Sequence, residues 1–122
     1  MGTSVFFNPE CSNCRTAAAI LEERGVDADY IRYLETSPTR DELEAVLVKL
    51  GTDDPRDIVR TKEPVYAELD LDSADRDQLL DAMVANPILI QRPIVIHGDR
   101  AIVARPPERL LELLDHKASP AE

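Results

Sequence analysis

The chain has 122 residues, enough for one domain with a buried core, and its 43% hydrophobic and 31% charged residues are typical of a globular protein. Asp and Glu outnumber Lys and Arg by 24 to 14, which gives a net charge of −10 at neutral pH. An acidic surface repels nucleic acid and anionic lipid, so neither is an expected partner, and any bound anion needs a local cluster of cations.

The start of the chain shows no targeting signal. "MGTSVFFNPE" lacks the basic and long apolar regions of a secretory signal, and no apolar stretch reaches transmembrane length. Phe6 stands where a myristoylation signal requires Ser or Thr. We therefore expect a cytoplasmic protein without a membrane partner. Because that compartment keeps thiols reduced, Cys11 and Cys14 are expected to serve redox chemistry or metal binding rather than a permanent disulfide.

The first third of the chain predicts a β-α-β unit. "SVFF" at residues 4–7 is a short strand stopped by Asn8 and Pro9. A helix follows from Ser12, with its apolar positions on one face, and Gly25 ends it. "DADYIRYL" at residues 27–34 is the expected second strand.

The middle of the chain predicts helices only. "TRDE" is a capping box with Thr39 as N-cap and Glu42 at the third helical position, and Gly51 ends the helix that it opens. Short helical turns are expected at residues 54–60 and 64–69. A further helix around residues 79–84 is closed by an Asn-Pro pair.

The last third predicts a β-hairpin and a helix. "RPIVIHGDRAIVARP" holds two apolar runs around a Gly98-Asp99 turn. Two prolines then open a helix whose buried face carries four leucines, Leu110, Leu111, Leu113 and Leu114. We expect a flexible tail at about residues 116–122.

This order predicts one α/β domain over residues 1–122 with a thioredoxin-like fold. A βαβ unit followed by a ββα unit is the pattern of that fold, here with a helical insertion of about 50 residues at about 36–88. A Cys-x-x-Cys pair at the first strand–helix junction of such a unit is a thioredoxin-like redox motif. A zinc site is a weaker interpretation, because only His97 and His116 could complete it and neither has ligand spacing. We therefore expect no metal.

The hairpin predicts two neighbouring arginines. Counting outward from Gly98-Asp99 pairs His97 with Arg100 and, five rungs later, Arg92 with Arg105. Directly opposed like charges destabilise a sheet, and a bound anion would offset that repulsion. The alternative is that the ladder frays first and leaves two solvated arginines. Pro93 opens a strand before a hairpin, a position where the thioredoxin-like fold often has a cis proline.

Four segments resemble one family. "NPECSNCR", "YLETSPTRDEL", "IVRTKEPVY" and "NPILIQRPIVI" are similar, in this order, to the arsenate reductases of the glutaredoxin-coupled, thioredoxin-fold type. The resemblance implies that Cys11 is the nucleophile and that Arg60, Arg92 and Arg105 bind the oxyanion. We expect Asn8 and Arg15, which flank Cys11, to belong to the same substrate site.

Two positions depart from the family pattern. Phe7 stands where members often carry a histidine, and Cys14 stands where many have serine or another residue. A Cys-x-x-Cys followed by arginine is typical of the related Spx regulators, which bind RNA polymerase. The alternatives to arsenate reduction are therefore a Spx-like redox switch and a general thiol-disulfide oxidoreductase.

The resemblance implies a mechanism. The N-terminus of a helix favours negative charge, so we expect Cys11 to be a thiolate that attacks arsenate. Cys14 is the candidate for a resolving thiol, or else a small buried residue. No tightly bound cofactor is expected. The electron donor is expected to be external, namely glutathione, glutaredoxin or thioredoxin, and the enzyme to be a monomer.

Overall fold

The computed structural model describes residues 2–118, which divide into two compact units. The first unit comprises the chain up to Arg32 and from Arg92 onward, and the second comprises Tyr33–Gln91. The predicted helical segment, residues 36–88, falls inside the second unit.

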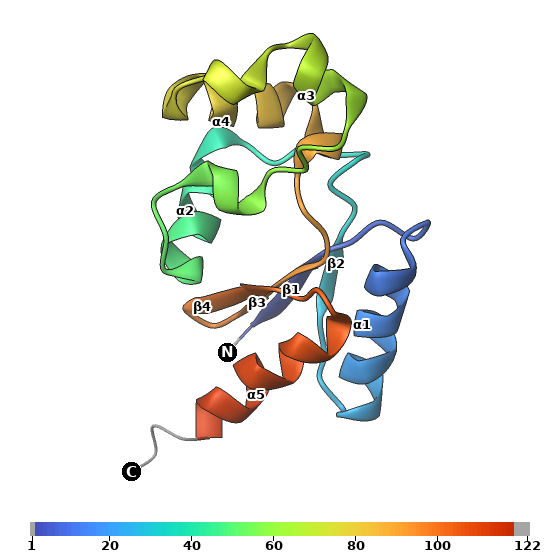
Figure 1. Ribbon diagram of the computed structural model, residues 1–122. Helices are drawn as coiled ribbons and strands as arrows, with labels where there is room; N and C mark the ends of the chain where they lie inside the picture. The colour runs from blue at the N-terminus through green and yellow to red at the C-terminus, as the bar shows by residue number, and fades with distance from the viewer. Residues whose placement is uncertain (1, 119–122) are drawn as a thin grey trace. The chain divides into compact units, whose positions relative to one another are not determined.

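The first unit is built on a four-stranded mixed sheet (Figure 1). Its strands lie in the order β2-β1-β3-β4, with β1 parallel to β2 and the other two pairs antiparallel. Their bounds are β1 Thr3–Phe6, β2 Asp29–Ile31, β3 Ile94–His97 and β4 Arg100–Val103. A βαβ unit followed by a ββα unit in this strand order is the thioredoxin-like fold that the sequence predicted.

Two helices, α1 (Ser12–Glu23) and α5 (Leu110–Ala118), cover the same face of this sheet. The core of the unit joins side chains from that face with side chains from both helices, because alternate residues of a strand point to the same side. Its buried members are Val5, Ala17, Leu21, Val95, Ala104, Leu110 and Leu113. Leu111 and Leu114, which the sequence also assigned to the buried face, are half-buried against this core.

The hairpin register is the predicted one over four rungs, from His97–Arg100 to Ile94–Val103. Beyond them the regular ladder stops. Ala104 still donates its N–H to the carbonyl of Pro93 at 2.9 Å, but Pro93 has no N–H to return the bond. The predicted rung between Arg92 and Arg105 is therefore not part of the ladder.

The second unit is helical, with α2 (Arg40–Leu50), α3 (Pro64–Glu68) and α4 (Arg76–Ala85). Its 3₁₀ turns are Pro55–Ile58, Leu71–Ser73 and Pro87–Leu89. Both hydrogen bonds of the predicted capping box at Thr39 are present, and Gly51 ends α2 at a φ of +80°, in the left-handed region that glycine tolerates. An isolated antiparallel bridge joins Val59 to Ile90.

Two predicted boundaries change. β2 is confined to Asp29–Ile31, shorter than the predicted strand 27–34. Helix α5 extends to Ala118, so the first residues of the predicted tail are helical, and residues 119–122 lie outside the described part of the chain. Within residues 2–118, no helix is both long and apolar enough to span a bilayer.

Candidate active site

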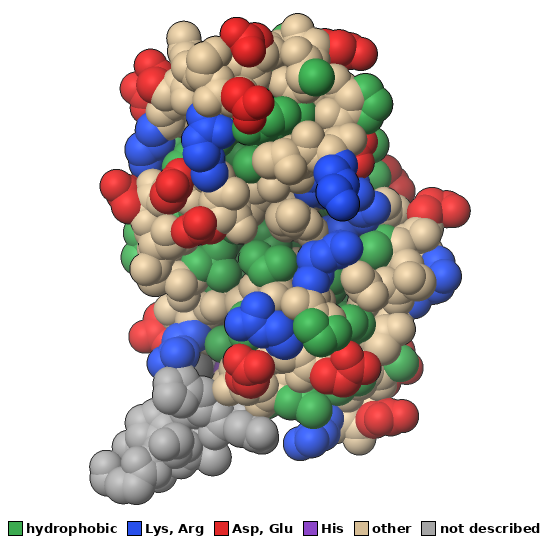
Figure 2. Space-filling view, viewed as in Figure 1, with side chains coloured by type: hydrophobic (Ala, Val, Ile, Leu, Met, Phe, Trp, Pro, Cys, Tyr) green, Lys and Arg blue, Asp and Glu red, His purple; other side chains and the backbone are tan. Residues whose placement is uncertain are grey.

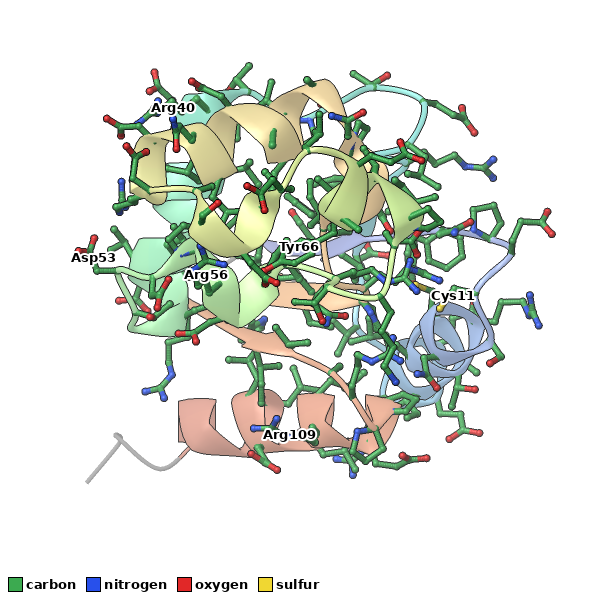
Figure 3. All side chains as sticks on the ribbon, turned by 45° about the horizontal axis from the view of Figure 1, so that its top comes forward. Cys11, Arg40, Asp53, Arg56, Tyr66 and Arg109 are labelled. Atoms are coloured by element: carbon green, nitrogen blue, oxygen red, sulfur yellow. The ribbon has the colours of Figure 1, made fainter. Side chains whose placement is uncertain are left out.

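Cys11 lies where the loop after β1 enters α1, as Figure 3 shows. Three hydrogen bonds shape this loop. The N–H of Cys11 donates to the carbonyl of Asn8 at 2.9 Å, and the N–H of Glu10 donates to Asn8 Oδ1 at 3.0 Å. Arg15 Nη1 donates to the carbonyl of Pro9 at 2.8 Å. The loop thus presents a half-buried Cys11 at the N-cap position of α1.

Asn8 and Arg15, predicted as substrate ligands, both have structural partners in this loop. The side-chain oxygen of Asn8 forms a turn with Glu10, and the guanidinium of Arg15 holds the carbonyl of Pro9. Their contact with a substrate stays a prediction. The sequence did not indicate their role in holding the loop, because Arg15 reaches back across six residues to a backbone atom.

Cys14 occupies the third position of α1 and is fully buried. Burial raises the pKa of its thiol to about 11, and the neighbouring Cys11 adds to that rise, whereas the backbone N–H of Asn8 and the charge of Arg92 act in the opposite direction. At neutral pH Cys14 is therefore a protonated thiol, able to donate a hydrogen bond.

The pKa of Cys11 lies below the ordinary value of a thiol. Partial burial of the sulfur opposes its ionisation, but the backbone N–H and thiol of Cys14 outweigh that effect, together with the charge and the guanidinium N–H groups of Arg92. By distance and angle the sulfur closes no side-chain cap hydrogen bond, so the N–H of Cys14 acts on it as a nearby dipole. Cys11 is thus the more nucleophilic of the two cysteines.

Arg92 and Arg105 meet through a backbone atom. Arg105 Nη1 donates to the carbonyl of Arg92 at 2.8 Å, and both arginines precede a proline through a cis peptide bond. Arg92 Nε is buried and has no hydrogen-bond acceptor within residues 2–118. Arg92, whose charge acts on Cys11, therefore carries a buried N–H that no acceptor of residues 2–118 satisfies.

Arg60, the third predicted oxyanion ligand, belongs to the second unit. Its N–H donates to the carbonyl of Leu89 at 2.7 Å, and its guanidinium pairs with Glu63 at 2.6 Å. Glu63 was not among the predicted site residues, although the spacing of three residues between opposite charges is compatible with such a pair.

Phe7, which replaces the histidine common in the family that the sequence resembles, packs on Tyr30 of β2. The two rings meet edge to face, with centroids 5.3 Å apart and planes at 68°. An apolar ring at this position brings no group that could exchange a proton near Cys11.

Comparisons with known proteins agree on one family. Residues 6–113 match the model of the ArsC family. The chain is 41% identical over 116 residues to an arsenate reductase of Haemophilus influenzae. This alignment covers 93% of this chain and 100% of that protein. It is 42% identical over 112 residues to an arsenate reductase of Neisseria meningitidis serogroup A, covering 90% of this chain and 96% of that one. The structure of an arsenate reductase from Vibrio cholerae aligns with a TM-score of 0.88 at 41% identity, over 92% of this chain and 97% of that chain.

Proposed function

The chain belongs to the ArsC family, and from that premise we propose that it reduces arsenate to arsenite, with Cys11 as the nucleophile. The observation that carries the proposal is the pairing of a thiol of lowered pKa with Arg92, whose charge contributes to that lowering and whose buried Nε–H has no acceptor within residues 2–118. A thiolate next to an available guanidinium suits attack on a tetrahedral oxyanion.

In the first step, the Cys11 thiolate attacks arsenic. A sulfur–arsenic bond forms and one arsenic–oxygen bond breaks, and the leaving oxygen takes up protons and departs as water. Arg92 and Arg105 bind the remaining oxygens and spread their negative charge. Arg60 is assigned to the same role on the strength of the motif "IVRTKEPVY" alone.

In the second step, another thiol attacks the sulfur of Cys11. A disulfide forms, the electron pair of the sulfur–arsenic bond stays on arsenic, and As(V) becomes As(III), which is released as arsenite. The chain supplies a candidate for this thiol in Cys14, one helical turn from Cys11, where its effective concentration is high.

The raised pKa of Cys14 bears on this role. Part of the rise comes from the Cys11 thiolate. Once the sulfur of Cys11 is bonded to arsenic it no longer carries that charge, so Cys14 ionises more readily in the adduct than in the resting enzyme. An external donor, thioredoxin or glutaredoxin with glutathione, then reduces the Cys11–Cys14 disulfide.

The test is arsenate-dependent oxidation of NADPH, coupled in turn to thioredoxin and to glutaredoxin with glutathione. We expect the wild type to turn over with at least one system, and the Cys11→Ser and Arg92→Ala variants to lose activity. No activity with either system contradicts arsenate reduction. Loss in Cys11→Ser but not in Arg92→Ala favours a general thiol-disulfide oxidoreductase.

The role of Cys14 is tested in the same assay. We expect the Cys14→Ser variant to lose turnover with the thioredoxin system and to depend on added glutathione. Unchanged turnover and unchanged reductant preference in this variant contradict a resolving role for Cys14.

A further inference from the structure

Arg60 carries a carboxylate partner of its own. Its Nη1 lies 2.6 Å from Glu63 Oε2, and the two side chains are only 21% and 17% exposed. Within the same segment the N–H of Glu63 donates to the carbonyl of Arg60 at 3.3 Å, so residues 60–63 form a tight turn that holds the two charged groups together.

The side chain of Glu63 does not cap the helix that follows it. Glu63 is the N-cap residue of α3, yet its side chain makes no cap hydrogen bond. The carboxylate pairs with the guanidinium of Arg60 instead. The turn itself is anchored, because the N–H of Arg60 bonds to Leu89 and Val59 bridges to Ile90. A half-buried ion pair on an anchored turn is less screened by solvent than an ion pair on the exposed surface, and its geometry is more fixed.

A carboxylate beside an anion-binding arginine discriminates among anions. An ionised carboxylate only accepts hydrogen bonds, so a fully deprotonated oxyanion next to it meets repulsion without compensation. Arsenate and phosphate keep at least one O–H group at neutral pH, which can donate to the carboxylate. Sulfate keeps none. A site that requires a hydrogen bond from its ligand strongly rejects an analogue that lacks the donor.

We propose that Glu63 is a specificity-determining residue, which makes the oxyanion site of Arg60 selective for protonated tetrahedral oxyanions over fully deprotonated ones. The inference rests on the proposed function, in that Arg60 is taken to bind the oxyanion. It adds the substrate class: the site accepts arsenate and phosphate and excludes sulfate, which resembles them in shape but carries no proton.

The test measures binding by calorimetry in a Cys11→Ser background, which binds the oxyanion without turnover. Arsenate, phosphate and sulfate are titrated at neutral pH into this protein and into its Glu63→Gln, Glu68→Gln and Arg60→Ala derivatives. Glu68 is the matched control, an exposed carboxylate on the same helix, α3. Circular dichroism establishes that each variant is folded.

We expect the parent to bind arsenate and phosphate at least tenfold more tightly than sulfate. Glu63→Gln should reduce the preference for arsenate and phosphate over sulfate at least tenfold, mainly because its affinity for sulfate rises. Glu68→Gln should leave this preference unchanged. An unchanged preference in Glu63→Gln overturns the inference and leaves arsenate reduction standing. If Glu63→Gln weakens the binding of all three anions equally, the inference is also overturned, because Glu63 then only positions Arg60.

If Arg60 does not bind the oxyanion at all, the titrations give a different result from a failure of the Glu63 inference alone. If the parent binds none of the three anions, or if Arg60→Ala binds them as the parent does, then Arg60 is not an oxyanion ligand. Either result overturns the selectivity of Glu63 and the role assigned to Arg60 together.

Discussion

At the scale of single residues, the two cysteines differ in acidity although they lie on one helical turn. Cys11 is half-buried with a pKa below the ordinary value, and Cys14 is fully buried with a pKa of about 11. Each shifts the other, since the N–H and thiol of Cys14 stabilise the Cys11 thiolate and that thiolate disfavours ionisation of Cys14. Burial of Cys14, the charge of Arg92 and the mutual position of the two thiols together set the difference between their pKa values.

The lowered pKa of Cys11 predicts how alkylation depends on pH. The thiolate is the reactive form, so the rate with iodoacetamide should rise at lower pH than for an ordinary thiol. Arg92→Met removes a charge that favours the thiolate, which raises the pKa of Cys11 and slows alkylation several-fold at neutral pH. At high pH, where both proteins are fully ionised, the rates should converge. Mass spectrometry at neutral pH should find one adduct, on Cys11.

Arg100→Met is the matched control for that experiment. It removes the same charge from an exposed position on the same hairpin, at the start of β4. Its alkylation profile should coincide with that of the wild type. A profile of Arg92→Met that also coincides with the wild type would show that Arg92 does not stabilise the thiolate.

At the scale of elements, the loop that carries Cys11 depends on the helix behind it. Arg15, in the first part of α1, donates to the carbonyl of Pro9, while Asn8 accepts hydrogen bonds from Glu10 and Cys11. The loop and the helix N-terminus thus form one hydrogen-bonded structure. This assigns Arg15 a positioning role that the sequence did not predict.

Replacing Arg15 by Gln should loosen this loop. A hydrogen bond worth about 1 kcal/mol corresponds to roughly a fivefold change in local opening, and we expect amide exchange at Glu10 and Cys11 to accelerate by about that factor. Arg15→Lys should retain part of the protection. Arg24→Gln, at the other end of α1, should have no effect. If Arg15→Gln leaves exchange unchanged and only raises KM for arsenate, Arg15 is a substrate ligand instead.

At the scale of the whole molecule, acidic residues outnumber basic ones. The net charge is −10, and acidic side chains are scattered over the face shown in Figure 2 with basic ones among them. Several basic residues are neutralised by acidic partners, as Arg76 is by Glu44 at 2.6 Å and Arg40 by Asp77. Any anion that the protein binds therefore depends on local cations rather than on the net charge, and Arg92, with a buried Nε–H that no acceptor of residues 2–118 satisfies, is one such cation.

The second unit depends on one arginine that serves no proposed ligand. Arg56 donates to Tyr66 Oη at 3.0 Å and to three backbone carbonyls, and Figure 3 shows Arg56 and Tyr66 close together. The three carbonyls belong to Leu71, Asp72 and Ala74. Arg56 thereby ties the 3₁₀ turn at residues 71–73 to the rest of the unit.

Arg56→Met should therefore lower the free energy of unfolding by about 2–4 kcal/mol, because it leaves several acceptors without a donor. Urea denaturation measures this change, and Lys62→Met, at an exposed position of the same unit, is the control. Amide protection should fall mainly in residues 33–91. Equal loss of protection in both units would indicate that the chain opens as a single cooperative body.

Local interactions could be predicted from the sequence because both partners lie within a few residues of each other. The capping box at Thr39, the stop at Gly51 and the four inner rungs of the hairpin depend on short-range spacing, and all are present. The thioredoxin-like fold followed from the order of these elements. The resemblance of four motifs to one family indicated the ArsC membership that the comparisons show.

Only the tertiary structure decided the environment of the pair in "NPECSNCR". The burial that raises the pKa of Cys14 is not visible in the sequence, and the charge that lowers the pKa of Cys11 comes from Arg92, which is distant in the sequence. The same holds for the carbonyl of Arg92 accepting from Arg105 where Pro93 stops the ladder. Residue spacing predicts which groups recur on a helix or strand, but desolvation and through-space charge depend on which distant segments surround a group.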